Sequence, residues 1–378
     1  MSKLSLFALL LNYLDVPKQM DFSTVSIIGW IYILFTIYRL MLTVYNLVYP
    51  FFLAEPRDLR EIAGAKWAVI TGATDGIGKG YAFELARKGF SILLVSRTQS
   101  RLDDVKAQIE KETSSEVMQF LNTKVRTIVF DFSSADIDYY EHSLLSQIRA
   151  LDVGILVNSV GSTFEYPDLY HKVDGGVKLF RHITVINIIP VTLLMAAVLP
   201  QMYERNSGII VNVASSSAYY KLRWFSVYAA SKVVFHVVFL LEGIIIITAI
   251  NKYISWLTKI VQKEYAKTNI IIQEVNPMIV VTKLAKVKRP SFFRPKADVY
   301  ARSAVRTIGI IKHTTGYFAH QIKVECLKWL PEFIADAQIH KRMILFHKVM
   351  VARKMRQAAI NEPTDAKNVS AQNKIISD

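Results

Sequence analysis

The chain has 378 residues, of which 52% are hydrophobic, and its mean hydropathy is +0.26. This length is enough for one large domain or two, and the hydropathy is high for a wholly soluble protein, so we expect part of the surface to lie in a membrane. The net charge is +15, and the single cysteine, Cys326, excludes an internal disulfide and indicates reducing surroundings. Because no Cys and His residues have metal-ligand spacing, we expect no structural metal.

The N-terminal region is typical of a membrane anchor. Residues 25–38 and 40–54 are apolar and flank a single charge, Arg39. About 20 apolar residues are enough to cross a bilayer. An early apolar run, residues 4–14, lacks the small residues of a signal-peptide cleavage site. Arg57 and Arg60 follow the apolar segment, which by the positive-inside rule places the rest of the chain in the cytosol. We therefore expect an uncleaved anchor and linker in residues 1–60.

Downstream of this anchor, short β-branched segments alternate with longer helical ones. We predict helices over residues 79–88 and 101–120 between the first strands. A β-α-β-α order predicts an α/β fold with a doubly wound, Rossmann-type parallel sheet, which we assign to residues 61–357. Residues 358–378 are polar, and we expect them to be a disordered tail. The predicted strands are residues 67–71, 91–96, 125–132, 153–159, 208–215 and 270–277.

A glycine-rich turn follows the first predicted strand, in the sequence "TGATDGIGKG". Gly72, Gly76 and Gly78 let the backbone turn sharply and approach a pyrophosphate, and the helix that follows points its first N–H groups at the phosphates. Glycine turns also occur for packing reasons. Here the turn lies between a strand and a helix, which is the context that indicates a dinucleotide site.

The end of the second predicted strand favours NADPH over NADH. An NAD site usually has an acidic residue at this position. This chain has Ser96 and Arg97 there instead, with Lys79 just behind the glycine turn. Two cations and no acid suit the 2′-phosphate of NADPH, although both could also face solvent.

Ser215, Tyr228 and Lys232 form a candidate catalytic group. Tyr228 and Lys232 are four residues apart and therefore share one face of a helix. A free tyrosine titrates near pH 10, and a neighbouring ammonium group favours the phenolate and lowers that pKa. A lone Tyr-x-x-x-Lys pattern is weak. Its position after the fifth predicted strand, with Ser215 at the end of that strand, makes it specific.

With these motifs the chain resembles the short-chain dehydrogenases/reductases over residues 63–356. More narrowly, it resembles the membrane-bound 17β-hydroxysteroid dehydrogenases of types 3 and 12 and the very-long-chain 3-oxoacyl-CoA reductases. The segments that carry the resemblance are "WAVITGATDGIGKGYAFELARKGF", "LLVSRTQSRL", "VGILVNSVGSTFEYP", "VINIIPVTLLMAAVLPQM", "VNVASSSA", "VYAASK" and "VVTKLAKVKRPSFF".

The resemblance implies a role for each matching residue. Asp131 would face the adenine, and Asn158 would brace the central strand in a motif whose usual second Asn is here Ser159. Asn187 would hold a water near Lys232 and complete the catalytic set Ser215, Tyr228, Lys232 and Asn187. The residues implied to bind NADPH or NADP+ are Gly72, Thr74, Gly76, Ile77, Gly78, Ser96, Arg97, Asp131, Asn158 and Lys232.

By resemblance, the expected reaction is the NADPH-dependent reduction of a ketone, with Tyr228 as proton donor and Ser215 bound to the substrate oxygen. The expected substrate is a 3-oxoacyl-CoA in fatty-acid elongation, with a 17-ketosteroid as the alternative. The expected location is the endoplasmic reticulum membrane, with the catalytic domain facing the cytosol. Membrane lipid is an expected partner, and the resemblance allows other elongation enzymes and a second copy of the chain.

The C-terminal third is strongly basic. Residues 283–356 hold 17 Lys and Arg against 4 Asp and Glu. Such a surface suits an anionic membrane or a CoA phosphate, or it is simply a solvated face. Because no nucleic-acid-binding motif accompanies it, we expect no nucleic-acid partner.

Residues 233–251 form an apolar block directly after Lys232, with Glu242 as its one acid. Without it, the chain would continue into an amphipathic helix with Ile254, Leu257 and Val261 at helical spacing. We therefore predict an insertion that loops out of the fold. A retained intron, a faulty gene model and a genuine excursion into the membrane stay open as its origin. A membrane-bound scaffold without turnover is the alternative function that this block raises.

Overall fold

The structure is a computed structural model, and it describes residues 22–113, 123–166, 168–219, 224–232 and 253–361. They divide into two compact units, Met1–Tyr49 and Pro50–Asp378. The predicted insertion at residues 233–251 lies outside the described residues, and so does the tail from residue 362 onward.

The first unit contains the segment expected to be the anchor. It forms α2 (Phe22–Val48), whose apolar side chains are largely exposed. The segment Ser26–Leu53 is long and apolar enough to cross a membrane. The helix α8 (Gly176–Arg205) passes the same test of length and composition, but over half of its most apolar window is buried inside the protein. We therefore assign α8 to the core of the second unit.

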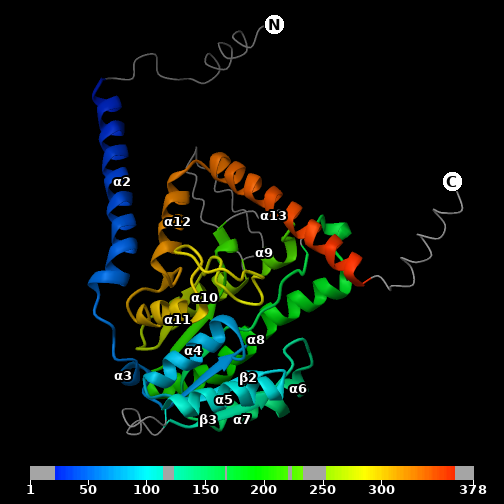
Figure 1. The fold of residues 1–378 in the computed structure, drawn as a ribbon. Coiled ribbons are helices and arrows are strands. Elements are labelled where there is room, and N and C mark those ends of the chain that lie inside the picture. Colours follow the sequence, from blue (N-terminus) through cyan, green and yellow to red (C-terminus); the bar gives the residue numbers. More distant parts are fainter. Residues whose placement is uncertain (1–21, 114–122, 167, 220–223, 233–252, 362–378) are drawn as a thin grey trace, which may run out of the picture. The chain divides into compact units, whose positions relative to one another are not determined.

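The second unit is built on a parallel sheet of seven strands, in the order β3-β2-β1-β4-β5-β6-β7 (Figure 1). This confirms the predicted α/β fold. Three of the observed strands end two or three residues before their predicted ends, because the residues beyond them turn into the loops that line the site. The strands are β1 (Trp67–Thr71), β2 (Ser91–Ser96), β3 (Val125–Val129), β4 (Val153–Asn158), β5 (Ile209–Val213), β6 (Ile271–Val275) and β7 (His313–Thr314), the last of which was not predicted.

Helices cover both faces of this sheet. Alternate strand residues point to opposite faces, so Ala68 and Ile70 pack with α4 (Gly76–Arg87), whereas Val69 packs with α8. The face covered by α4 is also covered by α5 (Gln99–Thr113) and α11 (Ala297–Arg306). The opposite face is covered by α8 together with α7 (Ser146–Arg149) and α10 (Tyr253–Glu264). The remaining elements are η1 (Tyr49–Leu53), α3 (Leu59–Ala63), α6 (Ile137–Tyr140), η3 (Glu141–Leu145), η4 (Tyr170–Lys172), η5 (Ser216–Tyr219), α9 (Ser226–Lys232), α12 (Phe318–Trp329) and α13 (Glu332–Asn361).

The helix α10 is the amphipathic helix predicted to follow the apolar block. Ile254 and Val261 are buried against the second face of the sheet, and Leu257 and Tyr265 pack beside them. Their spacing of three to four residues places all four side chains on one side of the helix.

A buried carboxylate ties α10 to the sheet. Glu274 on β6 is 1% exposed and accepts a hydrogen bond from Ser255 on α10 at 3.0 Å. It also accepts from Asn276 at 2.9 Å and pairs with His313 at 3.0 Å. Burial by itself raises the pKa of Glu274, but its hydrogen bonds to His313, Asn276 and Ser255 outweigh burial and hold the pKa below its ordinary value.

We expect Glu274→Gln to lower the free energy of unfolding by about 1–3 kcal/mol at neutral pH, because it weakens charge-assisted hydrogen bonds in a buried site. A carboxylate with a lowered pKa stabilises the fold above the unfolded-state pKa, near 4.5, and this stability is lost as the pH falls through the folded-state value. The difference between parent and variant should therefore shrink below about pH 4. Urea unfolding of parent and variant in detergent micelles, at pH 7 and in acid, measures the difference in unfolding free energy at each pH.

Glu110→Gln is the matched control. Glu110 forms an exposed pair with Lys106 at 3.9 Å, and such a pair contributes about 0–1 kcal/mol. Equal losses of unfolding free energy in Glu274→Gln and Glu110→Gln would contradict the role of Glu274. A difference between parent and Glu274→Gln that grows as the pH falls would contradict it as well.

Candidate active site

A cleft of about 460 Å³ lies at the carboxyl ends of the strands. Mostly apolar side chains line it, with Ser215 and Tyr228 among the polar ones. The glycine turn after β1 forms one wall, and the loop after β6 forms another. Ligands of open parallel sheets bind at this edge, so the cleft is the candidate site. Among the described residues, no group of three or more His, Cys, Asp or Glu side chains could hold a metal ion.

The glycine turn has the conformation that its sequence predicts. Gly72 and Gly76 have φ angles of +65° and +56°, which side chains rarely tolerate. A Cβ at Gly78 would lie 2.5 Å from the carbonyl oxygen of Gly72. Because α4 begins at Gly76, its first N–H groups face the cleft, and Ile77 lines it. This turn can therefore hold an anionic phosphate against the helix N-terminus.

Thr71 holds this turn against the end of β4, a role that the sequence reasoning missed. Its hydroxyl accepts the N–H groups of Ser159 and Val160 at 3.0 and 3.1 Å and donates to the carbonyl of Val157 at 3.4 Å. The Cα of Val160 lies only 3.1 Å from where a Cβ would stand on Gly72. The sequence signal for this role was a hydroxyl residue, Thr71, at the end of a buried strand just before the glycine turn.

The residues at the ends of β2 and β3 lie beside the glycine turn. The hydroxyls of Thr74 and Ser96 lie 3.0 Å apart, and the next residue, Arg97, is exposed. A backbone hydrogen bond from Ser133 lowers the pKa of Asp131, and the charge of Arg97 lowers it further. Lys79, expected near a 2′-phosphate, instead donates to Gln108 on α5 at 2.9 Å. Arg97 is thus the cation that this edge presents beside Asp131.

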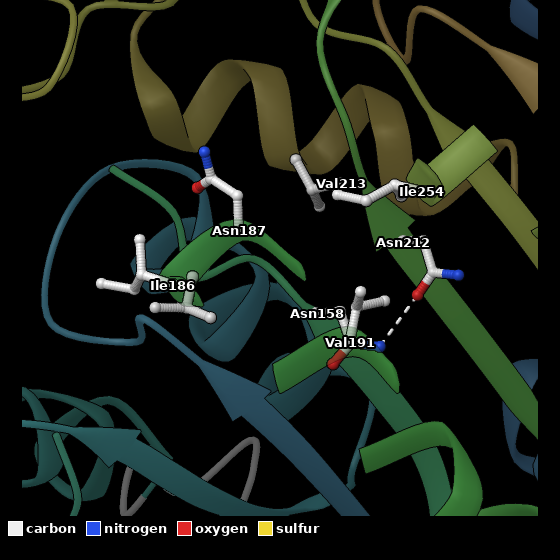
Figure 2. Close-up of a pocket in the computed structure, with 8 residues that line it drawn as sticks. Asn158, Ile186, Asn187, Val191, Asn212, Val213 and Ile254 are labelled. Carbon is white, nitrogen blue, oxygen red and sulfur yellow. Dashed lines mark hydrogen bonds between the residues drawn. The ribbon is translucent and has the colours of Figure 1, made fainter. Parts of the chain in front are cut away.

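Asn158 lies at the end of β4 and joins it to β5 through a side-chain hydrogen bond. Its Nδ2 donates to Oδ1 of Asn212 at 2.8 Å, and Figure 2 shows this bond beside a small cavity. Asn212 in turn donates to Thr258 on α10 at 2.9 Å. The sequence reasoning did not single out Asn212, which links two strands and a helix beneath the site.

Ser215 and Tyr228 meet at the cleft. The Ser215 hydroxyl follows β5 and accepts the N–H group of Ser217 at 3.1 Å. Burial raises the pKa of Tyr228, and its hydrogen bonds to Ser215 and Ser217 act in the opposite direction. Since the net pKa stays above the ordinary tyrosine value, the phenol is protonated at neutral pH and can donate a proton.

Asn187 lies across the same small cavity as Asn158 (Figure 2). Its Oδ1 accepts the N–H of Ser162 at 2.9 Å, and its Nδ2 donates to the Ser162 carbonyl at 3.1 Å and to the Ser231 hydroxyl at 3.0 Å. Ser231 donates to the carbonyl of Tyr228 at 2.8 Å. Asn187 therefore positions the helix that carries Tyr228. The helix α9 ends at Lys232, whose side chain lies outside the described residues.

The helix α13 supplies a wall of the cleft that the sequence reasoning missed. Met343, Phe346 and Met350 line the cleft from this helix. The Phe346 ring lies 6.1 Å from that of Phe225, just ahead of α9. A spacing of three and then four residues between apolar side chains in "MILFHKVM" was the signal for one buried helix face.

We expect Thr71→Val to weaken dinucleotide binding at least tenfold, because it leaves two buried N–H groups without their acceptor, at about 1–3 kcal/mol each. Thr71→Ser keeps the hydroxyl and should bind within about threefold of the parent. Quenching of tryptophan fluorescence by NADPH measures both affinities. Equal weakening in the two variants would show that the methyl group, not the hydroxyl, matters.

Comparison with known proteins agrees with this geometry. The family described as short chain dehydrogenase matches residues 66–239. The very-long-chain 3-oxoacyl-CoA reductase let-767 of Caenorhabditis elegans is 43% identical over 87% of this chain and 96% of its own length. The very-long-chain 3-oxoacyl-CoA reductase of Rattus norvegicus is 34% identical over 78% of this chain and 84% of its own. A solved 7beta-hydroxysteroid dehydrogenase superimposes with a TM-score of 0.59 at 16% identity, covering 75% of this chain and all of that one, so the two share a fold.

Proposed function

The chain belongs to the short-chain dehydrogenase family, and on this premise we propose that it is an NADPH-dependent very-long-chain 3-oxoacyl-CoA reductase. The proposal rests above all on one arrangement: Tyr228 and Ser215 meet in an apolar cleft whose other wall is the glycine turn. Two relatives that carry the name of this activity support it.

The residues present fit a dinucleotide. A Cβ at Gly78 would lie 2.5 Å from the Gly72 carbonyl oxygen, so the turn can pack this tightly, and bring its backbone up to a diphosphate, only because glycine stands there. Arg97, with Ser96, would bind the 2′-phosphate of NADPH, and Asp131 would face the adenine. The contact between Thr74 and Ser96 holds these two loops together. When bound, the cofactor supplies the hydride.

Tyr228 would donate a proton to the ketone oxygen as negative charge develops on it. Burial raises the pKa of Tyr228, so the phenol holds its proton at neutral pH. The Ser215 hydroxyl would hydrogen-bond the same oxygen and hold it near the phenol. Lys232 would bind the nicotinamide ribose and assist the proton transfer, and Asn187 would position α9 for both groups.

The apolar lining of the cleft suits the acyl chain of such a substrate. Met343, Phe346 and Met350 are joined there by Leu284 and Val287 from the loop after β6. A steroid is also apolar, and a 17-ketosteroid is the alternative substrate. NADPH consumption by the full chain in detergent, with a very-long-chain 3-oxoacyl-CoA and with a 17-ketosteroid, tests the proposal. Turnover of the steroid alone, or of neither compound, would contradict it.

The same proposal includes a location. We place α2 across the endoplasmic reticulum membrane as an anchor, with the catalytic unit on the cytosolic side. Its length and apolar composition support this. Other enzymes of fatty-acid elongation and a second copy of the chain are the partners that we propose beside membrane lipid.

Replacing Tyr228 by Phe removes the proton donor and little else. We expect kcat to fall by about 10²- to 10⁴-fold, while the dissociation constant of NADPH stays within about twofold. Stopped-flow NADPH oxidation and fluorescence titration give the two quantities. Tyr81→Phe is the control, because the Tyr81 hydroxyl is buried and has no hydrogen-bond partner among the described residues, and its kcat should equal that of the parent. A loss of NADPH affinity as large as the loss of rate would contradict the role of Tyr228.

Arg97→Asp should shift the cofactor preference towards NADH, because it replaces a phosphate-binding cation with an acceptor for the ribose hydroxyls. We expect the ratio of kcat/KM for NADPH to that for NADH to fall at least tenfold, as for the loss of one charged hydrogen bond. Lys106→Asp makes the same change of charge on the exposed side of α5 and should leave the ratio unchanged. If Arg97→Asp and Lys106→Asp have similar NADPH/NADH ratios of kcat/KM, Arg97 does not bind the 2′-phosphate.

A further inference from the structure

Lys323 on α12 lies near two arginines that come from two other elements, Arg294 and Arg342. On α12, the Nζ of Lys323 lies 4.1 Å from the centroid of the Phe293 ring. Arg294 closes the hairpin that carries Phe293, with backbone hydrogen bonds of 2.9 Å to and from Ser291. Burial lowers the pKa of Lys323, and the charges of Arg342 on α13 and of Arg294 lower it further. Lys323 therefore lies beside the hairpin that carries Arg294, within electrostatic reach of both arginines.

This cluster has no acidic residue to balance it. Within the part of the chain that the structure describes, no Asp or Glu forms an ion pair with Arg294, Lys323 or Arg342. By contrast, Lys328, also on α12, pairs with Glu325 at 2.9 Å. Holding three like charges together costs free energy that an acidic neighbour would offset. The arrangement therefore fits an anion supplied from outside the chain.

The cluster lies next to the substrate cleft. Residues 278–282 after β6 run along the cleft, and both the hairpin and α12 contact them. Val281 donates its N–H to the carbonyl of Pro295 at 2.9 Å, and Met278 donates to Nδ1 of the buried His320 at 3.3 Å. The helix α13 lines the cleft through Met343, the residue after Arg342. Figure 1 draws the yellow loops of this region beside the orange α12.

A CoA thioester has the shape that such an arrangement requires. Its apolar acyl chain and its ketone would enter the cleft, while the pantetheine arm carries the phosphates out to the surface. Guanidinium and ammonium groups bind phosphate through charge-assisted hydrogen bonds. A 17-ketosteroid carries no anionic group for these cations to bind.

We infer that Arg294, Lys323 and Arg342 bind the phosphate groups of the CoA portion of the substrate, and so select a CoA thioester over an uncharged ketone. This inference rests on the proposed function, because it concerns the substrate of the same cleft. It adds a specificity-determining site outside the residues that carry out the reduction.

The test compares two substrates that share one acyl chain. One is a 3-oxoacyl-CoA, and the other is the 3-oxoacyl thioester of N-acetylcysteamine, which lacks the nucleotide and its phosphates. In the full chain with Arg294→Gln, Lys323→Gln and Arg342→Gln combined, we expect the KM for the CoA thioester to rise at least tenfold, as for the loss of one or more charged hydrogen bonds. The KM for the N-acetylcysteamine thioester, the KM for NADPH and kcat should all stay at the parent values.

Lys348→Gln is the matched control, since Lys348 is an exposed cation on α13 outside the cluster, and it should behave like the parent. An equal rise of KM for both thioesters would mean that the triple variant distorts the cleft, and it would overturn the inference. An unchanged KM for the CoA thioester would overturn it as well. Vesicles of phosphatidylcholine with and without phosphatidylserine give a further arm. If the triple variant loses binding only to the anionic vesicles while its KM for the CoA thioester is unchanged, the cations bind lipid headgroups instead.

A failure of the proposed function gives a different pattern of results. If the parent chain reduces neither thioester, the reductase assignment fails, and calorimetric titration with free CoA still tests the cluster. Binding that is at least tenfold tighter in the parent than in the triple variant supports the site. Equal affinities would refute it.

Discussion

The hydroxyl of Thr71 ties the end of β1 to the end of β4, because it accepts the N–H groups of Ser159 and Val160 at once. This contact brings Val160 so close to Gly72 that a side chain there would be crowded, and Gly72 also has a φ of +65°, which side chains rarely adopt. This contact helps to fix the positions of the glycine turn, the start of α4 and the floor of the cleft. Asn158 then extends the same connection to β5 through Asn212, and Ser215 follows that strand.

Beneath the catalytic pair lies a second polar layer, whose members hydrogen-bond to one another. Asn187 uses both ends of its amide on Ser162 and Ser231, and Ser231 continues to the carbonyl of Tyr228. Asn212 similarly reaches Thr258 on α10. Because a buried polar group is costly to leave without a partner, such a layer fixes one arrangement of α9 relative to the sheet.

The parts of the site that the sequence predicted are those with local signatures. The glycine spacing around Gly76 and the pair Tyr228 and Lys232 depend on residues close together in the chain, so they can be read without a structure. The roles of Thr71 and Asn212 depend on contacts between residues some 46 to 89 positions apart. The α13 wall could not be predicted either: the periodicity at Met343 shows that one helix face is buried, but not what it is buried against.

The wall that α13 gives to the cleft has a consequence for biosynthesis. The helix follows every strand along the chain, so the ribosome delivers the sheet, the glycine turn and Tyr228 before it delivers Phe346. Domains generally fold as units, and α13 belongs to the same compact unit as the sheet, so this unit cannot be completed before α13 has emerged. Until then, any cleft that has formed lacks its α13 wall, and Phe225 lacks its contact with Phe346. During that interval the cleft is a surface that a chaperone or the adjacent bilayer can shield.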